Sequence, residues 1–90
     1  MAHKEQSQLL EELTQAKERV DVGGKYSHYK HSDQFYTILA VGFIESTEEP
    51  CVVYKAEYGE KLVWVRTLKD FTAKVSLEGG KQVDRFTKVV

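Results

Sequence analysis

The chain is 90 residues long and carries 13 Lys and Arg against 14 Asp and Glu, for a net charge of −1. A chain of this length forms one small domain, which buries about 60 to 65% of the surface that its unfolded form exposes. Because the charges balance, the chain as a whole has no field that attracts phosphate backbones, and a nucleic-acid binder of this composition needs a local basic patch.

The same composition argues against export, membrane insertion and a bound metal. Cys51 is the only cysteine and cannot form an intramolecular disulfide, and the three histidines do not fall at zinc-ligand spacing. No segment approaches the roughly 20 apolar residues that cross a bilayer, and the first residues lack the apolar stretch of a signal peptide. We therefore expect a cytoplasmic protein with no cofactor and no metal site.

Residues 4–19 predict an amphipathic helix, because they are rich in Glu, Gln, Leu, Lys and Ala and contain neither Gly nor Pro. Its apolar stripe consists of Leu9, Leu10, Leu13, Ala16 and Val20. Residues 23–24 are both glycine, which suits the end of a helix and a change of chain direction. A stripe this narrow needs a partner. It either docks on the rest of the chain, which we prefer, or pairs with a second copy, so we expect a monomer or a weak dimer.

After Gly24 the chain changes to short β-branched and aromatic segments separated by turn residues, a pattern typical of an antiparallel β domain. Strands are expected at residues 25–30, 35–45, 51–58, 62–67, 73–77 and 82–88. The predicted fold class is mainly β, a small antiparallel barrel or roll with one N-terminal helix. Residues 1–24 then form the helix and linker, and residues 25–90 form the small β-barrel domain.

Two local features are expected within the β domain. The long second strand is apolar on both faces, so both faces should be covered, and Gly42 within it marks a bend or bulge. Its two alternating sets are Ile38, Ala40, Gly42 and Ile44 on one face and Leu39, Val41 and Phe43 on the other. Residues 67–71 are too few for a helix of normal length, so a single 3₁₀ turn should bury Leu68 and Phe71.

An ordered set of motifs in the β region resembles the bacterial domain-of-unknown-function family numbered 1653 over about residues 23–88. The motifs are Gly24-Lys25-Tyr26-Ser27-His28-Tyr29-Lys30, Tyr36-Thr37-Ile38-Leu39, Val52-Val53-Tyr54, Tyr58-Gly59, Trp64-Val65-Arg66 and Arg85-Phe86. The resemblance implies a compact β roll or barrel of the Src-homology-3-like type and no established activity. The N-terminal helix lies outside it.

The chain departs from the family pattern at three places. Ser27 stands where relatives carry a basic residue, residues 43–45 (Phe-Ile-Glu) stand in place of an Arg-His-Ser stretch, and Thr67 stands in place of a proline. If the basic positions bind an anionic ligand in relatives, part of that site is missing here.

The residues that suggest a binding site are aromatic or ionisable side chains on the predicted strands. The candidates are Tyr26, His28, Tyr54, Tyr58, Trp64 and Arg66. Each has a purely structural interpretation as well: His28 as a half-buried histidine, Trp64 as a core anchor, and Arg66 as half of an ion pair with Glu57 or Asp70. His31 is interpreted as a turn residue.

Catalysis has little support in the sequence. Cys51 has no base or helix N-terminus beside it, and Ser27 next to His28 lacks the strand, turn and helix of a nucleophile elbow. No phosphate-binding loop or metal-ligand spacing is present. We therefore expect no enzyme.

Two functional classes and one structural role remain. We favour a small binding module whose aromatic strip receives a peptide, a protein or a small anionic ligand. The second class is a single-stranded nucleic-acid-binding barrel, with phosphate contacts from Lys25, Lys30, Lys55, Lys61 and Arg66, against which the balanced charge counts. The structural role is an assembly protein that dimerises through the N-terminal helix.

Overall fold

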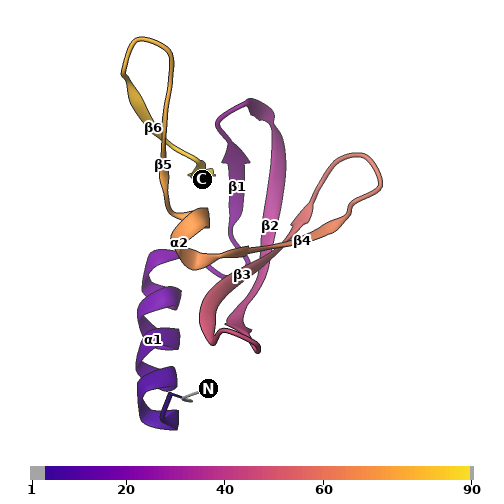
Figure 1. The fold of residues 1–90 in the computed structure, drawn as a ribbon. Helices are drawn as coiled ribbons and strands as arrows, with labels where there is room; N and C mark the ends of the chain where they lie inside the picture. The colour runs from indigo at the N-terminus through magenta and orange to yellow at the C-terminus, as the bar shows by residue number, and fades with distance from the viewer. Residues whose placement is uncertain (1–3, 90) are drawn as a thin grey trace.

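The fold, known here from a computed structural model that describes residues 4–89, is an antiparallel β domain preceded by one helix (Figure 1). Its elements are α1 (Gln6–Arg19), β1 (Lys25–His28), β2 (His31–Ile44), β3 (Glu49–Ala56), β4 (Val63–Thr67), α2 (Leu68–Phe71), β5 (Lys74–Ser76), β6 (Gln82–Asp84) and β7 (Phe86–Val89). Five strands form one sheet in the order β4-β3-β2-β1-β7, and β5 pairs with β6 as a separate hairpin. The prediction of a mainly β fold with an N-terminal helix is confirmed.

The large sheet ends at β4 on one side and at β7 on the other, and within residues 4–89 these two strands do not pair with each other. The hydrogen-bond ladder is therefore open, and of the predicted barrel or roll no closed barrel is found among these residues. All neighbouring strands in it are antiparallel, including β1 and β7, which lie far apart in the sequence.

The first hairpin differs from its predicted bounds. β1 ends at His28, which pairs with His31, so only Tyr29 and Lys30 form the turn. β2 begins at His31 rather than at residue 35. Residues 32–34, whose polar character indicated a loop, lie within β2 as extra residues that have no partners in β1. This arrangement brings His28 and His31 side by side at one end of the sheet.

The bulge in β2 lies at Leu39 and not at Gly42, so that prediction was wrong. Ile38 pairs with Tyr54 and Ala40 with Val53, which leaves Leu39 without an opposite residue. One extra residue shifts the alternation of faces by one position. Ile38 is therefore buried, and Val41 packs against the same core, whereas Leu39 is 44% exposed. The two predicted face sets are wrong for the same reason, and the strand is not covered on both sides.

The helix α1 packs on its own domain, against β2 and β3. Ala16 and Val20 from its stripe belong to the main core, whereas Leu10 remains exposed. The linker holds the end of the helix in place: Gly23, at φ +86°, donates its backbone N–H to the carbonyl of Ile38 at 2.8 Å. A left-handed φ of this size favours glycine, which explains the residue at this turn.

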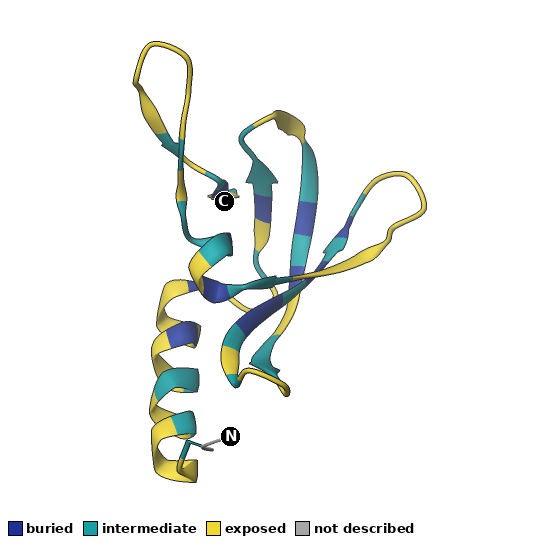
Figure 2. Cartoon of the chain, in the orientation of Figure 1, coloured by how far each residue is buried: buried dark blue, intermediate teal, exposed yellow. Residues whose placement is uncertain are grey.

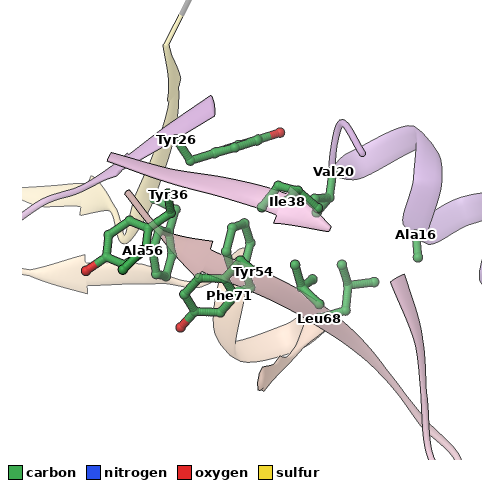
Figure 3. Close-up of a cluster of buried hydrophobic side chains, with 11 residues drawn as sticks. Ala16, Val20, Tyr26, Tyr36, Ile38, Tyr54, Ala56, Leu68 and Phe71 are labelled. Carbon is green, nitrogen blue, oxygen red and sulfur yellow. The ribbon is translucent and has the colours of Figure 1, made fainter. Parts of the chain in front are cut away.

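The core contains aromatic rings from five separate elements, β1, β2, β3, α2 and β7; Figure 2 shows where buried residues lie along the chain and Figure 3 shows their side chains. Phe86 on β7 stacks on Phe71 of α2, with centroids 4.2 Å apart and ring planes at 6°. Tyr36 of β2 and Tyr54 of β3 meet Phe86 edge-on at 5.7 and 5.4 Å. Offset and edge-to-face ring pairs of this kind stabilise a fold beyond the area that they bury.

The segment after β4 buries Leu68 and Phe71 as predicted, but it forms a single turn of α-helix, α2, rather than a 3₁₀ turn. The side chain of Thr67 accepts the backbone N–H of Asp70 at 3.1 Å and caps this turn. Thr67 stands at one of the departures from the family pattern, so the substitution supplies a helix cap.

Replacing the central ring should destabilise the protein strongly. We expect Phe86→Ala, at a residue 8% exposed, to lower the free energy of unfolding by about 3–5 kcal/mol, because a buried cavity replaces the ring. Leu10→Ala, on the exposed side of α1, serves as the control and should change it by about 0.5 kcal/mol or less. Urea unfolding of both variants checks this, and equal effects would contradict the assignment of the core.

Candidate functional site

An open hollow of about 260 Å³ lies at the end of the sheet where the β1–β2 turn meets β4 and β7. It is lined by His28, Lys30, His31, Tyr36, Tyr54, Tyr58, Trp64, Arg66 and Phe86. Five of the six candidate residues from the sequence line it. They come from β1, β3, the β3–β4 loop and β4, so only the folded chain brings them together.

Tyr26 is the candidate that lies elsewhere. It is 7% exposed and packs edge-on against Phe71 at 5.6 Å. Its hydroxyl accepts the backbone N–H of Asp21 at 2.9 Å, so the residue joins the linker after α1 to the core.

Four lining residues were not among the candidates: Lys30, His31, Tyr36 and Phe86. Lys30, Tyr36 and Phe86 do appear in the motifs that carry the family resemblance, and Lys30 was also a candidate phosphate contact. His31, the first residue of β2, had no such signal, and its place in the lining follows only from the position of the β1–β2 turn beside the hollow.

Arg66 is held by two partners and keeps one nitrogen free. Its Nε donates to the Tyr54 hydroxyl at 3.0 Å, and its Nη1 donates to the carboxylate of Asp70. Of the two carboxylates considered from the sequence, Asp70 is therefore the partner, whereas Glu57 accepts a hydrogen bond from Thr37 at 2.5 Å. Within residues 4–89 these bonds leave Nη2 with its two protons for another acceptor.

Arg66 stays protonated in this environment. Partial burial pulls the pKa of its guanidinium down, but the hydrogen bonds to Asp70 and Tyr54 outweigh that effect and raise the pKa above its usual value. The centroid of the Phe86 ring lies 5.6 Å from the guanidinium carbon, within the range of a cation–π contact.

The hydroxyls of Tyr36 and Tyr54 in the hollow remain protonated. Burial raises the pKa of Tyr54, although the hydrogen bond from Arg66 opposes this, and burial together with the bond to Tyr58 raises that of Tyr36. The hydroxyls of Tyr36 and Tyr58 share a hydrogen bond of 2.6 Å, so one of these two protons stays available. The Tyr54 hydroxyl accepts from Arg66 and keeps its own proton for a further acceptor.

His28 is a neutral imidazole in a positive environment. Its pKa is lowered first by burial and then by the positive charges of Arg66, Arg85, Lys30 and His31. The Nδ1 atom accepts the backbone N–H of Lys30 at 3.2 Å, which places the proton of the neutral ring on Nε2. The ring also packs edge-on against Phe86 at 5.1 Å.

The charge of the hollow differs from that of the chain. Four of its lining residues are basic or imidazole side chains and none is a carboxylate, although the chain has 14 acidic residues. Asp70 lies outside the lining set and is bound to Arg66, with Arg85 also 3.7 Å from it. The hollow therefore offers rings, hydroxyl protons and positive charge to a ligand.

Three further findings concern metal binding, the cysteine and membrane-spanning helices in the part of the chain described. Among residues 4–89 no group of three or more His, Cys, Asp or Glu side chains is placed to hold a metal ion. Cys51 is buried, and burial raises the pKa of its thiol, which opposes formation of a nucleophilic thiolate. Within the same residues, no helix has the length and apolar character needed to cross a membrane.

Comparison with known proteins identifies the family. The sequence profile of the family described as "Protein of unknown function (DUF1653)" matches residues 24–88. The chain belongs to this family. A crystal structure of a DUF1653 protein from Bordetella bronchiseptica is similar, with a TM-score of 0.63 and 29% identity over 74% of this chain and 85% of that one. No curated protein matches the chain. The resemblance recognised in the sequence is confirmed, and α1 lies outside the DUF1653 match.

Two departures from the DUF1653 pattern lie away from the hollow. Ser27 is next to His28 on β1, so the two residues lie on opposite faces of the strand. Residues 43–45 lie beside the β2–β3 turn, where Phe43 pairs with Pro50. None of these residues lines the hollow. The expectation that they weaken a basic site therefore does not apply to this hollow.

The exposure of Trp64 predicts the outcome of removing its ring. Because the residue is 49% exposed, we expect Trp64→Ala to lower the free energy of unfolding by about 1–2 kcal/mol, well below the cost for a buried ring. Urea unfolding monitored by circular dichroism measures this. A loss as large as that of Phe86→Ala would show that Trp64 is a core residue.

Proposed function

We propose that this DUF1653 domain is a binding module that receives an anionic group in the hollow between His28, Trp64 and Arg66. One observation carries the proposal: the lining combines four basic or imidazole side chains with five rings and contains no carboxylate. Pockets of this kind use apolar walls for affinity and a few polar groups for orientation.

Three donors are placed to meet the anion. Arg66 retains the protons on Nη2, His28 has its proton on Nε2, and the Tyr54 hydroxyl has a proton to donate. Hydrogen bonds from an ionised donor are roughly twice as strong as those between neutral groups, so Arg66 should dominate. The rings of Trp64 and Phe86 then flank the part of the ligand to which the anionic group is attached.

We also infer that the curved sheet is an incomplete barrel of the Src-homology-3-like type. Arg66 on β4 and Phe86 on β7 meet at 5.6 Å, although their strands lie at opposite ends of the sheet. This contact supports a sheet that curls until its two edges approach.

Removing the charge of Arg66 tests the proposed site. We expect benzoate, a flat carboxylate, to bind wild type and to bind Arg66→Gln about tenfold more weakly, because a charge-assisted hydrogen bond is lost. Titration followed by the NMR shifts of the Trp64 indole measures both affinities.

Lys74→Gln is the matched control for this experiment. Lys74 also forms an ion pair, with Asp84 at 3.0 Å on the β5–β6 hairpin, but it does not line the hollow. Its substitution should leave benzoate binding unchanged. Equal weakening in the two variants, or equal binding by wild type and Arg66→Gln, would refute the site.

The pKa of His28 provides a test, because the proposal predicts the direction in which a bound anion changes it. Because its pKa in the free protein lies below 6.5, a nearby anion should raise it, and binding should therefore strengthen as the pH falls through the titration of His28. NMR titration of the imidazole with and without benzoate measures the shift. A pKa that is unchanged or lowered by benzoate would contradict binding beside His28.

The same depressed pKa predicts the effect of pH on stability. Unfolding releases the imidazole to its ordinary pKa near 6.5, so the unfolded chain binds more protons, and stability contributed by neutral His28 falls as the pH drops below that value. His28→Gln should flatten this dependence in thermal unfolding between about pH 5 and pH 7. An unaltered slope would exclude His28 as its source.

The nucleic-acid alternative has one supporting observation, the presence of rings beside Lys30 and Arg66 in the hollow. Binding to single-stranded oligonucleotides at low salt, where counterion release favours it most, would support that function in place of the first. Dimerisation through α1 has less support, because Ala16 and Val20 of its apolar stripe already pack inside the domain.

A further inference from the structure

The outer side of β4 is a free sheet edge next to the hollow. β4 is an end strand of the large sheet, and no strand within residues 4–89 pairs with its outer side. Ala56 donates its N–H to the carbonyl of Leu62 at 2.9 Å, which fixes the alternation of the β3–β4 ladder. With Tyr54 opposite Trp64 and Val53 opposite Val65, the backbone of Trp64 bonds to β3 whereas that of Val63 and Val65 points outward.

This edge lacks two features that often prevent pairing with another chain, a β-bulge and a proline. The pairing of β4 with β3 has no bulge, and the strand contains no proline. Val63 and Val65 are 54% and 57% exposed, and most of β4 is exposed in Figure 2. The opposite edge, β7, carries Lys88, whose ammonium lies 3.1 Å from Asp21. Exposed apolar edges are sites of strand addition.

The side chains of β4 indicate what would pair there. Trp64 and Arg66 line the hollow, and their alternation places them on the same face of the strand. In an added antiparallel strand, the residues opposite these two occupy non-hydrogen-bonded pairs, in which side chains approach most closely, at about 4.5 Å between Cα atoms. The residue opposite Arg66 should then be acidic. The residue opposite Trp64, two positions later, should be apolar.

A second, smaller cavity supports the apolar position. It has a volume of about 120 Å³ and adjoins Trp64 on the side of Leu62. Its lining residues are Ala56, Tyr58, Gly59, Glu60, Leu62 and Trp64. One aliphatic side chain is a suitable occupant.

We propose that the ligand is an extended acidic peptide that adds to β4 as an antiparallel strand, with a carboxylate against Arg66 and an aliphatic side chain against Trp64. This inference rests on the proposed function and names the partner of the same hollow. Strand addition uses the backbone for affinity and alternate side chains for specificity.

Charge complementarity favours a peptide over a second copy of this chain. Residues 62–66 contain no acidic side chain. If two β4 strands paired across a two-fold axis through Val65, each Arg66 would lie opposite a Trp64. If the axis passed through Trp64 instead, each Arg66 would lie opposite a Leu62. Neither arrangement supplies a carboxylate, so the positive charge of the hollow would remain unbalanced.

The probe is a capped heptapeptide, acetyl-Thr-Thr-Glu-Thr-Leu-Thr-Thr-amide, titrated against the full chain by NMR. We expect shifts along β4 and at Trp64, and about tenfold weaker binding when Gln replaces the Glu, as for loss of a charge-assisted hydrogen bond. N-methylation of the fourth residue, whose N–H faces Val65, should abolish binding. N-methylation of the fifth, whose N–H points away from β4, should be tolerated. Equal effects of the two N-methylations would overturn strand addition.

The protein side of the test uses the outward N–H of Val65. Val65→Pro removes this donor without removing a bond to β3, and proline is tolerated at such edge positions. Val65→Thr keeps the donor and is the matched control. We expect Val65→Pro to lose the peptide but keep benzoate, and Val65→Thr to bind both. Backbone NMR spectra of each variant establish that it is folded.

The outcomes separate the two proposals. If benzoate binds and the peptide does not, strand addition is wrong and the anion site stands. If neither binds, both proposals fall. If the peptide fails to bind while sedimentation shows a dimer that Val65→Pro abolishes, the edge belongs to a second copy, and the peptide inference is overturned.

Discussion

The stack of Phe86 on Phe71 is the interaction on which the rest of the structure depends. It joins the C-terminal strand β7 to α2, and the rings of Tyr36 and Tyr54 close around it from β2 and β3. Together with the hydrogen bond from the Arg85 guanidinium to the Asp70 carbonyl, this cluster holds β7, at one end of the sheet, against α2, which follows the strand at the other end. A small domain has little apolar area to bury, so such a concentration of large rings is an effective way to stabilise it.

The same ring also forms part of the hollow, so core and site are continuous. The centroid of the Phe86 ring lies 5.1 Å from that of His28 and 5.6 Å from the guanidinium carbon of Arg66, and the same ring stacks on Phe71. A side chain that packs on a buried ring has few alternative positions. The geometry of His28 and Arg66 is therefore set by the packing of the core, whereas Lys30 lies in the β1–β2 turn.

Arg66 and Asp70 connect the site to the short helix α2. Asp70 accepts from Arg66, its backbone N–H is capped by Thr67, and its carbonyl accepts from Arg85 at 3.1 Å. The carboxylate of Asp70 thus fixes the orientation of the Arg66 guanidinium, and its negative charge offsets part of the positive charge of Arg66. The charges of Arg66 and Lys30, with no carboxylate in the lining, leave the hollow positive in a chain whose formal net charge is −1.

The sequence by itself determined the N-terminal helix, the first five strands, the family and most of the residues of the candidate site. The strand predicted at residues 82–88 is in fact two strands, β6 and β7, which belong to different sheets. Periodicity distinguishes a helix from strands, and the paired glycines and polar turns divide the chain, because both signals are local. Alternation also shows that Trp64 shares a face with Arg66. These properties depend only on neighbours along the chain.

The tertiary structure decided which faces meet. One extra residue at Leu39 reversed the faces of β2, and no local pattern distinguished that position from Gly42. Tyr26 and His28 lie on the same side of β1, yet packing against Phe71 makes the first a core residue while the second lines the hollow. The absence of carboxylates from the lining, and the free edge of β4 beside it, are likewise relations between strands distant in sequence. Only the pairing of the strands and the curvature of the sheet determine such relations.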